Sequence, residues 1–294
     1  MLRYLLFLFL LVTVVWAAAS EAALYGVARL PAPVLNTPGF KSVFGGQDGR
    51  TLKTDHCGQV RALEYIALPG TVFRLLEQVS GGEPAVFRVE TDEYPTPAGG
   101  ALYVESRFLE LKEILPPPRS RQLPLKKEIL SRLKTGLGSP YVWGGNIQQG
   151  VGELMGMFYR GTFSKAERER LTLTGLDCSG LLYQATDGAT PRNTSQLISF
   201  GAGLPITGKT ADELLKLLEP LDLIVWNGHV LIVLDKQTVI ESRLDCSKPG
   251  HGGVVITSLR QRLTQIMRTR SPINEWPPGS KQKDVFVVRR WFGL

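Results

Sequence analysis

Cysteine and histidine are scarce in this chain, which has three of each among 294 residues. Their spacing fits no zinc finger, and the aromatic-rich motif of RNA-binding domains is missing. Nucleic acid is therefore disfavoured as a partner, although the net charge of +7 would suit it. A basic chain of this kind favours other anionic partners, such as cell-wall polymers or acidic lipids.

Long apolar runs are also rare, and the one near the N-terminus, Leu5 to Trp16, is short for a membrane span. It follows a basic start, Met1 to Arg3, and precedes small residues at 17–22 with A-x-A-like cleavage points. We expect a signal peptide at 1–22 that is removed on export and leaves no membrane span. The protein would then be periplasmic or extracellular, in a bacterium. An uncleaved anchor is the alternative.

An odd number of cysteines in an exported chain leaves one thiol over, even if the other two pair. The three are Cys57, Cys178 and Cys246. Cys57 and Cys246 can form a bridge between distant segments, or each can be a small buried residue. Both alternatives stay open on the sequence alone.

The first half of the chain looks β-rich. Short apolar runs at 72–76, 85–89 and 101–104 are separated by turns of glycine, proline and aspartate, which predicts a small β-barrel domain over 23–118. Pro116 to Pro118 reads as a stiff linker, so a second domain is expected over 119–294.

The second half mixes helix and strand, which predicts an α+β fold. Apolar spacing indicates a helix at 126–135, and a capping box, Thr210 to Glu213, opens another. Asn227-Gly228 between two apolar runs is a strong hairpin signal. The strands expected here are 223–226, 229–234, 238–243 and 285–291.

Cys178 stands in the segment Leu176-Asp177-Cys178-Ser179-Gly180-Leu181, at the expected start of a helix. Free backbone N–H groups and the helix dipole stabilise an anion at such a position, and a thiolate is the attacking form of cysteine. Cys178 is therefore a candidate nucleophile. The alternative is a buried structural cysteine.

A thiol nucleophile needs a base, and His229 begins the strand that follows the predicted hairpin turn. If Leu234 pairs with Thr238, His229 faces Arg243, and Glu241 lies diagonally on the same face. A loop with an even number of residues would place Glu241 on the opposite face of the sheet, so this prediction depends on the strand register. His251 is expected in a solvated loop, and His56 beside Cys57 suggests metal only faintly.

Five short motifs stand in order between about 125 and 245. They are Pro140-Tyr141-Val142-Trp143-Gly144-Gly145, Asp177-Cys178-Ser179-Gly180, Pro191-Arg192-Asn193-Thr194-Ser195-Gln196, Leu221-Asp222-Leu223 and His229-Val230. In this order they resemble the NlpC/P60 family of cell-wall cysteine peptidases. The first half resembles, more weakly, the bacterial SH3-like domains that precede such catalytic domains and help to close the cleft around a stem peptide with a free N-terminal L-Ala.

The resemblance implies a papain-like core that cleaves the γ-D-glutamyl–diamino acid bond, such as that to diaminopimelate, in peptidoglycan stem peptides. Cys178 would attack, His229 would be the base, and Glu241, 12 positions later, would orient it. No metal or organic cofactor is needed, and a monomer is expected.

The resemblance also implies which residues would line the substrate side: Tyr141, Asp177, Ser179, Arg192 and Ser195. Arg192 and Ser195 either hold the D-Glu carboxylate or tie down a loop. Glu93 and Tyr94 are further candidates for contacting a substrate amine.

Two features depart from the family. The third position is usually His, Asn or Gln, and a carboxylate there would strengthen a thiolate–imidazolium pair. We therefore expect Glu241→Gln to keep substantial activity and Glu241→Ala to lose much more. The second departure is a long insert at 146–176, which joins two site segments and is expected to act as a lid, or else as a solvated decoration.

Other functions remain open at this point. The chain could be a muramoyl-L-alanine amidase or an acyltransferase on the same scaffold, or a cell-wall-binding protein without activity. The substrate could be intact peptidoglycan or recycled fragments.

Overall fold

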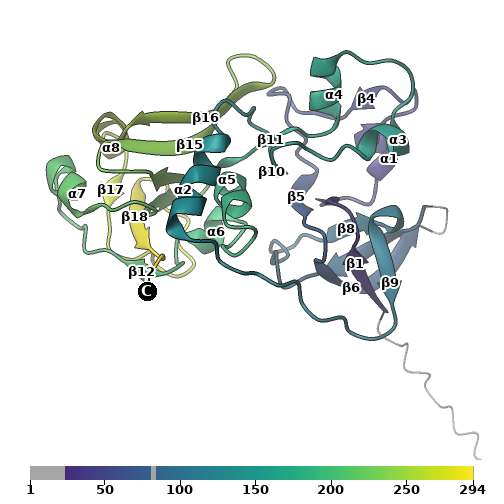
Figure 1. The fold of residues 1–294 in the computed structure, drawn as a ribbon, viewed down its shortest axis with the longest axis horizontal. Coiled ribbons are helices and arrows are strands. Elements are labelled where there is room, and N and C mark those ends of the chain that lie inside the picture. The colour runs from purple at the N-terminus through teal and green to yellow at the C-terminus, as the bar shows by residue number, and fades with distance from the viewer. Residues whose placement is uncertain (1–23, 81–83, 294) are drawn as a thin grey trace, which may run out of the picture.

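The computed structural model describes residues 24–80 and 84–293, so the predicted signal peptide lies outside the described residues. The first half forms a seven-stranded antiparallel sheet in the order β5-β2-β8-β7-β6-β1-β9 (Figure 1). Its strands are β1 (Leu24–Ala28), β2 (Ala32–Leu35), β5 (Leu63–Ala67), β6 (Val72–Ser80), β7 (Val86–Glu90), β8 (Leu102–Glu105) and β9 (Leu109–Lys112). Among the described residues β5 and β9 do not pair, so a closed barrel is not confirmed.

The hydrophobic core of the first half extends into the sequence insert. Val151, Leu154 and Leu171 are fully buried and belong to the same cluster as the sheet residues Tyr65 and Phe73. The insert carries β10 (Asn146–Ile147), α3 (Leu154–Phe158), α4 (Lys165–Leu171) and β11 (Gly175–Leu176), and it packs beside α1 (Phe40–Val43), β3 (Phe44–Gly45) and β4 (Thr51–Leu52) (Figure 1). The core of the first half therefore includes residues that follow the predicted division at 119.

The second half is built on another sheet, in the order β12-β18-β13-β14-β15-β16, with β17 beside β18. Helices α2 and α5 cover one face, while α7 and α8 cover the other. The elements are α2 (Lys126–Thr135), α5 (Cys178–Ala185), α6 (Thr194–Leu197), β12 (Ala202–Gly203), α7 (Ala211–Leu217), β13 (Leu223–Trp226), β14 (His229–Val233), β15 (Thr238–Asp245), β16 (His251–Ser258), α8 (Leu259–Met267), β17 (Ser271–Pro272) and β18 (Val285–Arg290). The mixed α+β character is confirmed.

Local signals in the second half predicted the elements well. Helix α2 spans the predicted residues, and Thr210 caps α7 in a capping box with Glu213. The Asn227-Gly228 turn joins β13 to β14, with Trp226 opposite His229. Residue 228 has a φ of 95°, which a glycine adopts without strain. The largest gap in the sequence-based prediction is the segment after β15, where β16 and α8 were not expected.

Buried polar contacts join the two halves. The side chain of Asn146 accepts a bond from Ile66 N at 2.9 Å and donates to Ile66 O at 2.8 Å, so it pairs with β5 as another strand would. Glu93 lies in an ion pair with Arg119 and accepts a hydrogen bond from Tyr183 on α5. Glu93 is 8% exposed and fully engaged, so its contacts favour a structural role over contact with a substrate.

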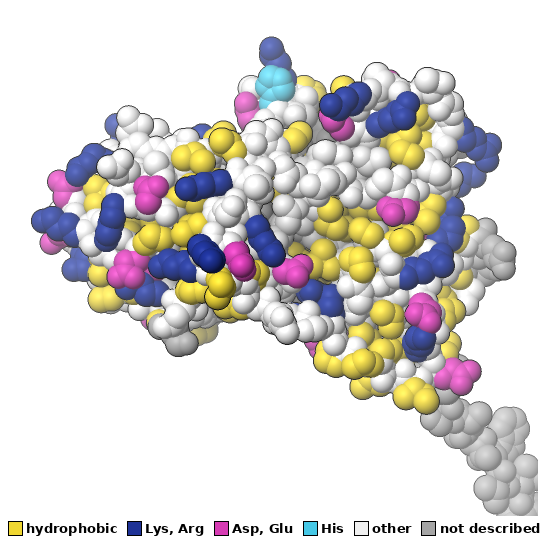
Figure 2. Space-filling model, in the orientation of Figure 1, with side chains coloured by type: hydrophobic (Ala, Val, Ile, Leu, Met, Phe, Trp, Pro, Cys, Tyr) yellow, Lys and Arg dark blue, Asp and Glu magenta, His cyan; other side chains and the backbone are white. Residues whose placement is uncertain are grey.

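Positive side chains are spread over the surface. Figure 2 shows Lys and Arg on both halves of one face, without a single basic patch. Within 24–80 and 84–293, no helix has the length and apolar character that crossing a bilayer requires.

Candidate active site

Cys178 occupies the first turn of α5, as the sequence predicts. Asp177 is the N-cap residue, and its carboxylate accepts a hydrogen bond from Gly180 N at 2.6 Å. The N–H groups of Cys178 and Ser179 precede the first intrahelical bond, so they stay available to a ligand. The positive end of the helix dipole points at the sulfur, and this position suits a cysteine nucleophile.

His229 and Glu241 lie together on the face of the sheet that α8 covers. Ile232 pairs with Ile240 and Val233 with Val239, which confirms the predicted register between β14 and β15. With this register the Nε2 atom of His229 is 2.7 Å from Oε2 of Glu241. The Trp226 ring lies 5.1 Å from the His229 ring and packs against it. The imidazole is therefore held between a carboxylate and an indole.

Contacts on both sides of the imidazole favour its charged form. Hydrogen bonds to the Cys178 thiol and to the Glu241 carboxylate outweigh the opposing effect of burial and raise the pKa of His229 to about 9. Since Nε2 faces Glu241, Nδ1 is the nitrogen left for the thiol. Cys178, His229 and Glu241 thus form a chain in which a proton can pass from sulfur to nitrogen.

Arg262 is a member of this cluster that sequence reasoning missed. Its Nε donates to Oε1 of Glu241 at 2.6 Å, and its Nη2 donates to Oε2 at 2.9 Å. Burial opposes ionisation of Glu241, but hydrogen bonds from His229 and Arg262 lower its pKa to about 2. The apolar spacing of Leu259, Leu263 and Ile266 could have revealed the helix, although nothing in it points to Glu241.

A cavity of about 250 Å³ lies beside Cys178, which is one of its lining residues. It is lined by Glu64 and Tyr94 from the first half and by residues in 141–144, 177–179, 192–194 and 227–228 from the second. Tyr141, Asp177, Ser179 and Arg192 are among the lining residues, as expected. Ser195 is exposed and is not among them, although its neighbours Asn193 and Thr194 are.

Arg192 is fully engaged by protein groups. It is 2% exposed, and it donates to Asp177 through Nη1 at 3.1 Å and Nη2 at 2.6 Å. It also donates to Ser179 Oγ, Asn146 Oδ1 and the Gly145 carbonyl. These bonds occupy all five of its N–H donors. Of the two roles considered for Arg192, the contacts favour tying the cavity wall together over holding a substrate carboxylate.

The insert does not cover the cavity. None of the residues 146–176 lines it, and Phe163 and Tyr159 are instead buried in the first core. Arg160 N donates to Gly49 O at 2.8 Å, which fixes the insert to the first half. The contacts therefore favour a packing role for the insert, and the expected lid finds no support in them.

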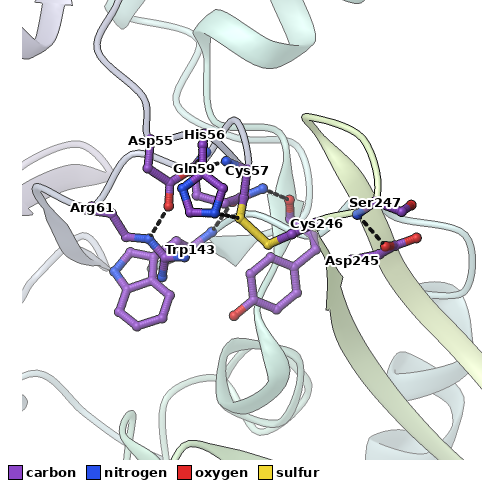
Figure 3. The surroundings of a disulfide bond; sticks show 10 residues. Asp55, His56, Cys57, Gln59, Arg61, Trp143, Asp245, Cys246 and Ser247 are labelled. Carbon is purple, nitrogen blue, oxygen red and sulfur yellow. Dashed lines mark hydrogen bonds and ion pairs between the residues drawn. A yellow bond between two sulfur atoms is a disulfide. The ribbon is translucent and has the colours of Figure 1, made fainter.

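Cys57 and Cys246 form a disulfide, which answers the question that the sequence left open (Figure 3). The bond ties a loop of the first half to the turn between β15 and β16. Within that loop, Gln59 accepts from Trp143 N at 2.8 Å and donates to Tyr141 O at 3.4 Å. The Arg61 guanidinium lies 4.2 Å from the centre of the Trp143 ring. The disulfide loop therefore supports the wall of the cavity.

Replacing both Cys57 and Cys246 by serine is expected to lower the free energy of unfolding by about 2–4 kcal/mol, because the cross-link closes a long loop in the unfolded chain. Urea unfolding followed by circular dichroism measures this. Ser247→Ala, beside the bridge, is the control. A double variant that unfolds at the wild-type urea concentration would contradict the expectation.

The remaining histidines lie outside the site. Nε2 of His56 is 3.3 Å from the sulfur of Cys57, and His251 is exposed at the start of β16 and not in a loop. His56, Cys57 and Cys246 cluster closely enough to hold a metal, but both thiols are consumed by the disulfide. Such a donor set does not fit a metal ion.

Comparisons with known proteins give distant likenesses. No protein-family model matches the sequence, and no curated protein is significantly similar to it. Solved structures that resemble the fold include three that are NlpC/P60 proteins by description or name. An NlpC/P60 family protein from Bacillus cereus is 16% identical, covers 92% of this chain and has a TM-score of 0.33; this chain spans 64% of its length.

RipD from Mycobacterium tuberculosis, described as a non-catalytic NlpC/p60 domain protein adapted to peptidoglycan binding, is 20% identical over 47% of this chain and 95% of its own, with a TM-score of 0.29. NlpC2 from Trichomonas vaginalis is 15% identical over 91% of this chain and 72% of its own, with a TM-score of 0.29. At these TM-scores the likeness carries no weight for the chemistry, which rests on the geometry of this chain.

Proposed function

We propose that this chain is a cysteine endopeptidase that hydrolyses the γ-D-glutamyl–diamino acid bond of peptidoglycan stem peptides. The observation that carries the proposal is the hydrogen-bonded set Cys178–His229–Glu241 beside a cavity that Cys178 helps to line. A nucleophile, its base and a third group that orients the base form the working unit of thiol peptidases.

In the proposed reaction His229 takes the proton of Cys178, and the thiolate attacks the carbonyl carbon of the amide. The free N–H groups of Cys178 and Ser179 stabilise the oxyanion, since they are already oriented by the helix. The imidazolium then gives its proton to the leaving amine, and the C–N bond breaks. Water, deprotonated by His229, releases the acyl group from Cys178 and restores the thiol.

Glu64 and Tyr94 suggest which end of the substrate enters the cavity. Tyr94 donates to Glu64 Oε2 at 2.9 Å and accepts from Asn193 Nδ2 at 3.1 Å, so both side chains are held in place. Glu64 is half-buried in the cavity wall, where a carboxylate suits a cationic amine. We propose that it binds the free α-amino group of a stem peptide, which restricts the enzyme to fragments already released from the glycan.

The proposed function is tested by mass spectrometry of two incubations, one with the tripeptide L-Ala-γ-D-Glu-diaminopimelate and one with intact sacculi. Release of L-Ala-D-Glu from the tripeptide alone is the expected result. Release of whole stem peptides from the glycan would indicate an amidase instead, and a new amide that requires an added amine would indicate a transferase. Binding to sacculi without any product would favour a wall-binding protein.

Substituting Glu64 by glutamine is expected to lower kcat/KM for the free tripeptide by about 10- to 100-fold, because a charge-assisted hydrogen bond to the amine is lost. The same peptide with an acetylated N-terminus is expected to be a poor substrate for both proteins. Steady-state kinetics on the two peptides measure this. Glu77→Gln, on the surface of β6, is the control. Equal wild-type rates on both peptides would disprove recognition of the amine.

Compartment and domain organisation complete the proposal. A disulfide is typical of proteins that fold in an oxidising compartment, which supports the expected export to the periplasm or exterior. We propose that the first half acts as an SH3-like module that supplies Glu64 and Tyr94 to the cavity.

A further inference from the structure

The Glu241 carboxylate is enclosed by positively charged groups. It has no exposed surface, and four contacts from three side chains reach it. His229 Nε2 and Arg262 Nη2 lie 2.7 and 2.9 Å from Oε2, while Arg262 Nε lies 2.6 Å and Arg243 Nε 3.8 Å from Oε1. Arg262 comes from α8, which belongs to neither of the strands that carry His229 and Glu241.

We propose that Arg262 is a positioning residue of the thiol site, which holds the plane of the Glu241 carboxylate against His229 and takes up part of its charge. For its catalytic consequence the inference rests on the proposed function. The contacts themselves do not depend on it.

The two-point contact explains how the orientation is held. A carboxylate on a flexible side chain can rotate about its last bond, but a guanidinium that donates to both oxygens prevents this. The carboxylate plane is then fixed relative to β14 and β15, and one lone pair of Oε2 stays directed at Nε2 of His229. The imidazole ring is oriented in turn, with Nδ1 toward the sulfur.

The charge of Arg262 explains why a carboxylate is tolerated at this position. A buried carboxylate paired with His229 alone would bind the imidazolium proton too tightly, and a general acid has to release that proton to the leaving amine. A guanidinium that shares the carboxylate weakens this hold. The effect depends on the charges that surround His229 as a whole. Those charged or titratable neighbours are Cys178 on α5, Glu241 and Arg243 on β15, Arg262 on α8, and Arg270, which lies over the Trp226 ring.

Proton NMR titration of the histidine ring signals tests the proposal without a substrate. The chain has three histidines, and the signal of His229 is assigned by its loss in His229→Asn. Arg262→Gln removes the charge and is expected to raise the pKa of His229 by about one unit, as two cations a few ångströms apart repel each other. Arg262→Lys keeps the charge and is expected to leave the pKa near the wild-type value. Arg260→Gln, an exposed partner of Asp212 on the same helix, is the control.

Kinetics separate positioning from general stability. Because Arg262 is not among the residues that line the cavity, both variants are expected to keep KM, while kcat falls about 10-fold in Arg262→Gln and about threefold in Arg262→Lys. A folded Arg262→Gln protein with an unchanged or lowered His229 pKa would overturn the proposal. If Arg262→Gln does not fold, Arg262→Lys decides: an unchanged kcat would overturn the proposal, and a lowered kcat with an unshifted pKa supports it.

Failure of the proposed function gives a different pattern. In that case the wild-type protein cleaves no stem peptide, whereas the NMR comparison of Arg262→Gln with wild type still decides whether Arg262 acts on His229.

Discussion

Replacing Cys178 by alanine is expected to abolish release of L-Ala-D-Glu from the tripeptide, with a loss in kcat/KM of at least about 10⁴-fold. No other free thiol remains in the chain, since Cys57 and Cys246 form the disulfide. His229 would then have no nucleophile to activate, and only binding and the oxyanion donors of α5 would be left. Mass spectrometry of the products, with time courses at several substrate concentrations, measures the loss.

Two controls accompany this prediction. The Cys178→Ala protein is expected to unfold in urea close to the wild-type midpoint, because the side chain is small and its loss leaves little empty space. Cys178→Ser keeps the shape and is expected to be nearly as inactive, since an alcohol is much harder to deprotonate than a thiol. Release of the same product by Cys178→Ala at the wild-type rate would remove this residue from the mechanism.

Substitution of Glu241 by alanine is expected to lower kcat/KM by about 10³-fold and the free energy of unfolding by about 3–5 kcal/mol. The loss in rate follows from the unrestrained His229 ring, and the loss in stability from the Arg262 guanidinium left without its buried partner. Glu241→Gln keeps an acceptor for His229 and is expected to lose less than Glu241→Ala. The sequence predicted that glutamine keeps substantial activity. With Arg262 beside it, an amide leaves a guanidinium unbalanced, and we expect a loss of about 10-fold.

Kinetics and urea unfolding at several pH values check this prediction. In the wild type the His229 pKa is raised from 6.5 to about 9. The stability that protonated His229 gains from Cys178 and Glu241 is therefore complete below pH 6.5 and is lost as the pH rises through 9. The Glu241 pKa is lowered from 4.5 to about 2, so its share is complete above pH 4.5 and is lost as the pH falls through 2. Both Glu241 variants are expected to lack the loss at low pH and to show a smaller loss at high pH, because the contact between His229 and Cys178 remains. Equal rates for Glu241→Ala and Glu241→Gln would exclude an orienting role.

Several predictions from the sequence succeeded because they rest on neighbouring residues. The helix start at Cys178 needs Asp177 as its cap, and the hairpin before His229 needs a two-residue turn with glycine second. From that turn, strict alternation of side chains fixes which residues share the face with His229. The diagonal to Glu241 follows from the three-residue loop at 235–237, so this part of the candidate site was within reach of the sequence.

Other predictions failed or stayed open because they depend on packing between distant segments. The insert at 146–176 looked like a lid, yet its apolar residues complete the core of the first half. Ser195 belongs to a motif that reaches the cavity and lies in the short helix α6, but it is not among the lining residues. The expected barrel is an open sheet over the described residues, since short strands and turns indicate strand content but not closure.

The amino-acid order alone predicted most of the elements and singled out the thiol, the imidazole and the carboxylate as candidates, because caps, turns and alternation act over a few residues. Which residues from distant parts of the sequence lie close together was decided only by the tertiary structure. Arg262 reaches Glu241 from 21 positions away, Glu64 and Tyr94 enter a cavity built by the other half, and Cys57 meets Cys246 over a separation of 189 residues. Such contacts have no local signature, because they arise where separately stable layers bury their apolar faces against each other.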